Sequence, residues 1–145
     1  DAGPLGCVEE GRVHWFQAPP VLPPAAMDAR RLQIVQQASA MPRVDWVTSH
    51  ADADGSQVRA LLAYGAAHPE AMPQGLVVAG TGNGTLHQAL EAALLEAQAK
   101  GVRVVRTSRC AHGPLLTHPG QLLSDARSLT PVKARIALAL ELLED

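Results

Sequence analysis

Aromatic residues are scarce in this sequence, at 3% of its 145 residues, whereas hydrophobic residues make up 47%. A hydrophobic core of this composition depends on Ala, Leu and Val, which suits helices packed on a β-sheet. The chain is long enough to bury one such core, so we expect one main domain of the α/β class.

Lysine is also scarce, because Lys100 and Lys133 are the only two, and no run of basic residues occurs. The formal net charge is −2 and the pI is about 6.3. Nucleic-acid binding needs clustered positive charge, so we expect no nucleic-acid partner. No apolar run approaches the roughly 20 residues that a membrane-spanning helix needs, so we expect no membrane partner either.

Cysteine is limited to Cys7 and Cys110, which lack metal-ligand spacing. These two residues could form one disulfide, but the sequence favours two reduced thiols. The six histidines are equally scattered: His14, His50, His68, His87, His112 and His118. We therefore predict no metal site and no cofactor.

The first part of the chain is predicted to be an arm rather than part of the core. Residues 6–17 alternate apolar and polar around Glu10-Gly11, which predicts a β-hairpin. Ala18 to Ala26 ("APPVLPPAA") contains four prolines, so it cannot continue a helix or a ladder. We assign residues 1–27 to a hairpin and Pro-rich linking arm and residues 28–145 to the α/β domain.

In the second part, predicted strands alternate with predicted helices. The strands are Val44–Ser49, Leu76–Gly80 and Val102–Ser108, and the helices are Asp54–His68, Thr85–Lys100 and one that starts at Thr130-Pro131. This alternation implies right-handed crossovers and a short parallel sheet of about four strands between helical layers, with Leu122-Leu123 as the fourth strand. The last helix is predicted to pack through Val132, Ile136, Ala139, Leu140 and Leu143.

The glycine-rich turn "GTGNG", Gly80–Gly84, follows the central predicted strand. Its spacing is not G-x-G-x-x-G, so a dinucleotide site is excluded. The backbone N–H groups of such a turn could receive a carboxylate. The next residues, Thr85 to Gln88, match a capping box, which favours Thr85 as a helix cap and leaves a second role open.

The other two strand ends give weaker signals. Asp52 and Asp54 lack calcium-loop spacing, so we expect a helix cap from Asp54 or Ser56 rather than a metal site. Cys110 and His112 have no orienting partner for a nucleophile. Arg109 could pair with a carboxylate of a ligand or of another subunit.

Three segments in order resemble one family. Gly75 to Cys110, which contains "AGTGNGT" and "VVRTSRC", resembles the C-terminal domain of bacterial L-asparaginases. The "GPLG" at the start resembles the family's crossing between its two domains. "LTPVKARIALALEL", Leu129 to Leu142, resembles its closing helix.

The resemblance implies hydrolysis of asparagine, and often of glutamine, by a threonine nucleophile in an N-terminal domain. This chain would then lack the catalytic groups, and we expect it to be inactive alone. The family's C-terminal domain completes the site of a neighbouring subunit in a homotetramer. On this resemblance Thr85, with Asn83 and Gly84, is expected to bind the substrate.

Two departures from the family pattern concern the site: Thr85 keeps the hydroxyl of the Ser that some members carry there but adds a methyl group, and an acidic residue is missing after the third strand. No acid occurs between Cys110 and Ser124, where many members carry a Glu that reaches the neighbour's site. The insertion Ala66 to Gln74 is expected to be a surface loop.

Two alternative functions remain open: a non-catalytic α/β module that binds a small ligand, and an amidotransferase subunit of the same fold. The start at Asp1, without Met or a signal-peptide pattern, suggests part of a longer protein and leaves bacterial cytoplasm or periplasm undecided.

Overall fold

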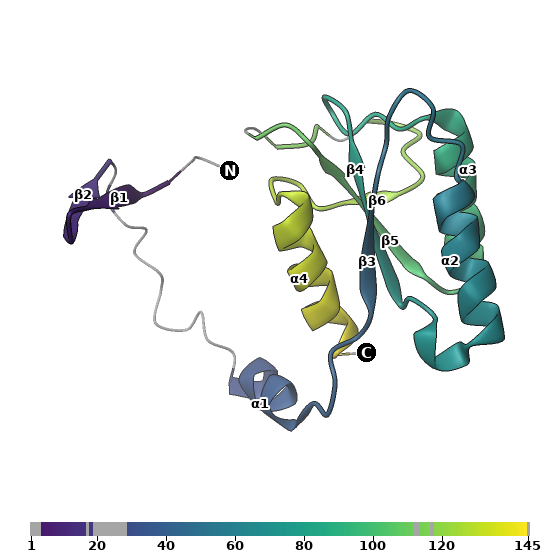
Figure 1. Cartoon of the computed structure of the whole chain (residues 1–145), viewed down its shortest axis with the longest axis horizontal. Helices are drawn as coiled ribbons and strands as arrows, with labels where there is room; N and C mark the ends of the chain where they lie inside the picture. The colour runs from purple at the N-terminus through teal and green to yellow at the C-terminus, as the bar shows by residue number, and fades with distance from the viewer. Residues whose placement is uncertain (1–3, 17, 19–28, 112–113, 117, 145) are drawn as a thin grey trace.

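The computed structural model describes residues 4–16, 18, 29–111, 114–116 and 118–144 (Figure 1). A four-stranded parallel sheet stands at the centre of the α/β domain, in the order β3-β4-β5-β6. Its strands are β3 (Val44–Thr48), β4 (Gly75–Gly80), β5 (Arg103–Ser108) and β6 (Ser124–Asp125). The predicted four-stranded parallel sheet is thus confirmed, with its last strand directly after Leu122-Leu123 rather than at these residues.

Helices cover both faces of the sheet (Figure 1). Helices α2 (Ser56–Ala67) and α3 (Gln88–Ala99) lie on one face, and α4 (Pro131–Leu142) lies on the other. Strand β4 pairs with both β3 and β5, and all six of its residues are buried. A strand covered on both faces has no need to alternate apolar and polar residues, which accounts for the sequence GLVVAG.

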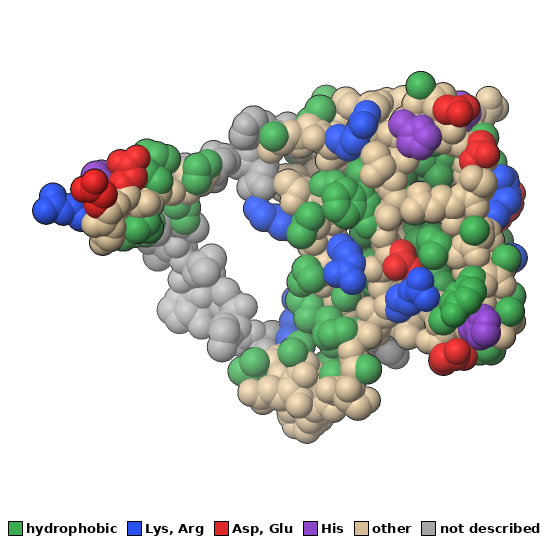
Figure 2. Space-filling model, viewed as in Figure 1, with side chains coloured by type: hydrophobic (Ala, Val, Ile, Leu, Met, Phe, Trp, Pro, Cys, Tyr) green, Lys and Arg blue, Asp and Glu red, His purple; other side chains and the backbone are tan. Residues whose placement is uncertain are grey.

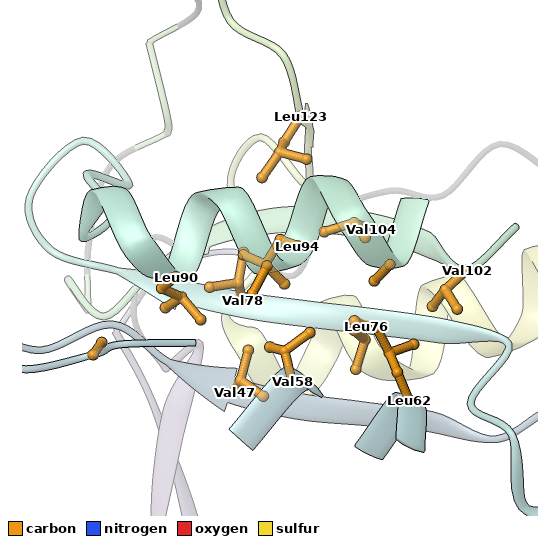
Figure 3. Packing of buried hydrophobic residues seen from close by; sticks show 13 residues of the cluster. Val47, Val58, Leu62, Leu76, Val78, Leu90, Leu94, Val102, Val104 and Leu123 are labelled. Atoms are coloured by element: carbon orange, nitrogen blue, oxygen red, sulfur yellow. The ribbon is translucent and has the colours of Figure 1, made fainter. Parts of the chain in front are cut away.

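The larger part of the core lies between β4 and the helices α2 and α3. In Figure 3, Leu90 and Leu94 of α3 and Val58 of α2 lie around Leu76 and Val78 of the sheet. These residues are at most 3% exposed, so each contributes on the order of 1.5–3 kcal/mol by leaving water. Apolar spacing in the sequence predicts these inner faces, and the structure buries the following residues of α2 and α3 as expected: Val58, Leu62, Gly65, Leu90, Ala93, Leu94 and Ala97. Leu61 and Leu86, which the same spacing includes, are partly buried against this core.

Glycine after the last apolar position of a helix predicts its end, and α3 does end just before Gly101, whose φ is +86°. The Gly101 N–H donates to the Gln98 carbonyl at 3.0 Å, and the Val102 N–H donates to the Ala97 carbonyl at 3.1 Å. This pair of bonds is a Schellman motif, in which a left-handed glycine satisfies the last carbonyls of the helix.

The prediction for the inner face of α4 is largely wrong. The helix packs on the sheet through Ala134, Leu138 and Ala139, of which only Ala139 was predicted. The physical reason is close approach: a Cβ on Gly75 would lie 2.8 Å from Leu138 Cδ2, so the sheet and the helix touch where Gly75 has no side chain.

The opposite side of α4 carries exposed apolar side chains: Val132, Ile136 and Leu140, at 59%, 49% and 38% exposure. Figure 2 shows this gathering of hydrophobic side chains on the α4 side of the domain. At the outer edge of the sheet, Arg135 of α4 donates from Nε to the carbonyl of Val44 in β3 at 2.7 Å.

The predicted hairpin near the start is confirmed. Strands β1 (Gly6–Glu9) and β2 (Arg12–Trp15) form a separate antiparallel sheet. Glu10 and Gly11 both have positive φ, 47° and 78°, as a type I′ turn requires. The proline segment 19–26 of the predicted arm lies outside the described residues.

Two further segments differ from the predictions. Helix α1 (Ala29–Gln37) was not predicted, and it buries none of its residues. The insertion before β4 forms a short 3-10 helix (Pro69–Ala71), but the loop is not wholly on the surface: Pro73 is fully buried and Met72 packs on the core. Within the described part of the chain, no helix combines the length and apolarity needed to cross a membrane.

Candidate functional site

The loops at the carboxyl ends of the strands are joined by hydrogen bonds. The His87 N–H donates to the Ser49 hydroxyl at 2.9 Å, which links the end of β3 to the start of α3. The Arg109 N–H donates to the Gly80 carbonyl at 2.9 Å, which links the end of β5 to the end of β4. The three strand ends therefore form one continuous edge, where open parallel sheets bind their ligands.

The glycine-rich turn at this edge is a closed loop. Thr81 and Thr85 form an antiparallel bridge, with N–H to carbonyl distances of 3.0 and 2.8 Å. Gly82 and Gly84 both have positive φ, at 49° and 74°, a conformation that other residues adopt only at a cost. A Cβ on Gly80 would lie 2.4 Å from the backbone of Gly84, so the two ends of the turn are in direct contact.

The prediction that Thr85 caps helix α3 is wrong. The helix starts at Gln88, and its N-cap is His87, whose Nδ1 accepts from the Ala89 N–H at 3.3 Å. The bridge to Thr81 holds both backbone groups of Thr85, so the helix cannot begin there. Thr85 is exposed, and among the described residues its hydroxyl makes no hydrogen bond. The hydroxyl is consequently available at the carboxyl edge.

Asn83, at the tip of the turn, uses its side chain within the protein. Its Nδ2 donates to the Leu116 carbonyl at 2.9 Å, and its Oδ1 accepts from the Leu116 N–H at 2.6 Å. Gly84 is buried beneath the same loop, since a Cβ there would lie 2.9 Å from Leu115 Cδ2. The structure thus brings Asn83, Gly84 and Thr85 together but gives the Asn83 amide an internal partner.

Beneath the turn lies a polar network, which the sequence analysis did not identify. Arg106 is 6% exposed and donates to Gln121 Oε1 at 2.5 Å. Gln121 in turn donates from Nε2 to Asp125 Oδ2 at 3.0 Å. Hydrogen bonds, first from Gln121 and then from the Arg127 N–H, hold the pKa of the Asp125 carboxyl below its ordinary value. The network keeps a guanidinium beneath Gly84, where Arg106 Nε would lie 3.3 Å from a Cβ.

Ser108, at the end of β5, is a second residue that the sequence analysis passed over. Its hydroxyl donates to the Gly82 carbonyl at 2.5 Å and accepts from the Cys110 N–H at 2.9 Å. A serine at the last position of a strand beside a glycine-rich turn is the signal that could have indicated this contact.

The predicted helix cap from Asp54 or Ser56 is found only in part, because the N-cap of α2 is Gly55 and Asp54 binds the first helical N–H from one residue further back. Asp54 Oδ1 accepts from the N–H of Ser56, the first residue of α2, at 2.8 Å. Hydrogen bonds from Ser56 hold the pKa of Asp54 below its ordinary value. Within the described ranges, no three His, Cys, Asp or Glu side chains gather as a metal site would require.

The third strand end offers no organised nucleophile among the described residues. Cys7 and Cys110 are both free thiols, and Cys110 is exposed. Arg109 is also exposed, so its guanidinium remains a candidate partner for a carboxylate. His112 lies outside the described residues.

A groove of about 440 Å³ lies away from the turn, between α4 and the strands β5 and β6. Its lining includes Gly101, Val102 and Arg103 at the amino end of β5, and Arg103 is paired with Glu141 at 3.0 Å. No residue of the Thr81–Thr85 turn lines it. Because parallel sheets bind ligands at the opposite end of their strands, the turn remains the better candidate site.

Known proteins are similar to this chain in sequence. The profile of the family described as Glutaminase/Asparaginase C-terminal domain matches residues 43–144. The glutaminase-asparaginase of Pseudomonas aeruginosa is 29% identical over 148 residues, covering 94% of this chain and 36% of that protein. L-asparaginase 2 of Escherichia coli is 30% identical over 152 residues, covering 97% of this chain and 38% of that protein.

A solved structure agrees with the sequence relatives. The crystal structure of a probable cytoplasmic L-asparaginase from Campylobacter jejuni matches with a TM-score of 0.72 at 28% identity, over 97% of this chain and 41% of that one. The chain therefore spans well under half the length of each of these relatives.

Proposed function

This chain belongs to the glutaminase/asparaginase C-terminal domain family, and on that premise we propose that it serves an amidohydrolase that converts L-asparagine to L-aspartate and ammonia. The observation that carries the proposal is the Thr81–Thr85 turn. It places at the carboxyl edge of a parallel sheet an exposed hydroxyl that has no hydrogen-bond partner among the described residues. A substrate with a carboxylate and an ammonium group is suited to such an edge, which offers hydroxyl and backbone groups.

In this proposal the chain supplies binding groups, and the nucleophile comes from another part of the enzyme. The Thr85 hydroxyl contacts the amino-acid portion of the substrate, and the Gly84 backbone allows close approach. Asn83 contributes through its backbone, because its amide is engaged by Leu116. None of the hydrogen bonds between described residues uses the N–H groups of Gly82, Asn83 or Gly84, which supports a role in holding a carboxylate.

We further propose that this edge completes the active site of a neighbouring subunit in a homo-oligomer. Among the described residues, this edge carries hydroxyl and backbone groups but no organised thiol nucleophile or metal cluster, and such an arrangement supports the role of half a site. The 145-residue chain alone should then release no ammonia from asparagine. Release of ammonia by the purified chain would refute the proposal that the nucleophile comes from another part of the enzyme.

Replacement of Thr85 in the full-length enzyme tests the site. Thr85→Val keeps the shape of the side chain and removes the hydroxyl, so KM for asparagine should rise about tenfold, the loss of a hydrogen bond of roughly 1.5 kcal/mol to a charged ligand. Thr85→Ser keeps the hydroxyl and is the matched control, for which KM should stay within about twofold. Because the hydroxyl does not cap α3, neither change should alter the free energy of unfolding by more than about 0.5 kcal/mol. An unchanged KM in Thr85→Val would refute the contact.

A non-catalytic module that binds a small ligand is the second candidate, favoured by the lack of a nucleophile among the described residues. Calorimetry with L-aspartate separates the two functions. A complete binding site within the chain would give saturable heat with the isolated 145 residues. Half a site gives saturable binding only in the full-length assembly.

A further inference from the structure

The two hydrogen bonds between Asn83 and Leu116 join segments 33 residues apart, and we infer from them that Asn83 is a positioning residue. It fixes the tip of the glycine-rich turn against the loop after β5 and thereby sets the orientation of Thr85. This inference rests on the proposed function, because Thr85 is taken to contact the substrate.

The amide of Asn83 matches the backbone of Leu116 in both directions. Its carbonyl oxygen accepts from the Leu116 N–H at 2.6 Å, and its nitrogen donates to the Leu116 carbonyl at 2.9 Å. A side-chain amide can donate and accept in one plane, so it pairs with the N–H and the carbonyl of a single residue as a strand neighbour would. A substrate would have to compete with this internal pairing.

The segment that Asn83 holds is itself anchored to the domain. The Leu115 N–H donates to the carbonyl of Arg127 at 2.9 Å. The Leu115 side chain is 7% exposed and lies over Gly84, since a Cβ there would be 2.9 Å from Leu115 Cδ2. Residues 114–116 are thus a fixed support, against which the tip of the turn can be held.

The turn needs such a support because of its two glycines. Gly82 and Gly84 flank Asn83, and glycine permits many backbone conformations. The bridge between Thr81 and Thr85 closes the base of the turn, and the Asn83 pairing closes its tip. Without the tip contact, only the bridge at the base holds the turn, and motion of Gly84 can then shift the side chain of Thr85, which directly follows it.

A double-mutant cycle in the full-length enzyme separates positioning from direct contact. Asn83→Ala removes both hydrogen bonds, and KM for asparagine should rise about fivefold while kcat changes less than twofold. In the Thr85→Val background the same change should alter KM by less than twofold, because the group that it positions is gone. Multiplicative effects of the two changes on KM would overturn the inference in favour of direct contact by Asn83.

A second measurement reads the pairing itself. Hydrogen exchange at the Leu116 N–H, which donates to Asn83, should accelerate at least tenfold in Asn83→Ala and remain unchanged in the control Thr85→Val. Asn83→Asp is a second variant for the case that Asn83→Ala folds poorly. It keeps an acceptor for the Leu116 N–H but places an oxygen against the Leu116 carbonyl, so KM for asparagine should rise in this variant too. Unchanged exchange in Asn83→Ala, or faster exchange with an unchanged KM, would overturn the inference. If the wild-type enzyme hydrolyses no asparagine, the proposed function fails, whereas faster exchange would still show the pairing.

Discussion

Three alanine substitutions in the glycine-rich turn should destabilise the chain by different amounts, because each glycine is required for a different reason. At Gly82, φ is +49° and nothing lies within 4 Å of a Cβ. Gly82→Ala therefore adds only left-handed strain, about 1–2 kcal/mol, less the roughly 0.4–1 kcal/mol gained from a stiffer unfolded chain. The expected net loss is about 1 kcal/mol.

Gly84 and Gly80 carry additional steric requirements. At Gly84, φ is +74° and a Cβ would meet Leu115 Cδ2 at 2.9 Å, so overlap with a side chain that can shift adds to the strain. We expect a loss of about 2–3 kcal/mol for Gly84→Ala. At Gly80 the Cβ would lie 2.4 Å from the Gly84 backbone, which cannot move without opening the turn. Gly80→Ala should cost about 3 kcal/mol or more.

Urea unfolding followed by circular dichroism gives the three free energies, and the slope against urea should be the same for all variants. Gly82→Asn is the matched control, because asparagine tolerates the left-handed region and should lose less than Gly82→Ala. The expected order of destabilisation is Gly82, then Gly84, then Gly80. If Gly80→Ala is as stable as Gly82→Ala, the close contact between the two ends of the turn is refuted.

Two other consequences concern the sheet and the network beneath the turn. Leu138→Ala should lower the free energy of unfolding by about 2–5 kcal/mol in denaturant titrations, because Leu138 is buried against the sheet. Val132→Ala, on the exposed side of α4, should change it by about 0.5 kcal/mol or less. Equal losses in the two variants would contradict the orientation of this helix. The folded-state pKa of Asp125 lies below its unfolded value, so its ionisation stabilises the fold above roughly pH 4 and this contribution is lost as the pH falls through the folded pKa. Asp125→Asn should therefore unfold with a shallower pH dependence below roughly pH 4 than the parent chain, and an identical dependence would show that its hydrogen bonds do not favour the ionised form.

The parts of the fold that could be predicted from the sequence are those set by local patterns. The inner faces of α2 and α3 follow from apolar spacing, and Gly101 ends its helix because a left-handed residue is needed there. The hairpin follows from Glu10-Gly11, whose backbone matches the twist of the two strands.

Other parts depended on contacts that no local pattern shows. Thr85 begins a sequence that matches a capping box, but its bridge to Thr81 delays the helix to Gln88. Helix α4 is apolar on more than one side, so its inner face was decided by where Ala134 and Leu138 could approach the sheet. Helix α1 buries no residue, and so its sequence had no core-facing stripe to detect.

The candidate site is still a prediction, and the structure adds how its residues are arranged. The resemblance drew attention to Asn83, Gly84 and Thr85, and the structure brings them to one edge. The partner of Asn83 is Leu116, which is 33 residues away and joined to it only in the folded chain. A contact between two loops of this kind has no signature in spacing or composition.

The hydrogen bond from Arg135 to the Val44 carbonyl bears on how the domain avoids aggregation. Strand β3 is the outermost strand on its side of the sheet, and the free backbone groups of an edge strand can pair with a strand of another molecule. The Arg135 guanidinium donates to the Val44 carbonyl of β3 at 2.7 Å and places a positive charge beside this edge. A strand from a second molecule would have to displace Arg135 before it could pair with β3, so the helix that covers one face of the sheet also protects its edge.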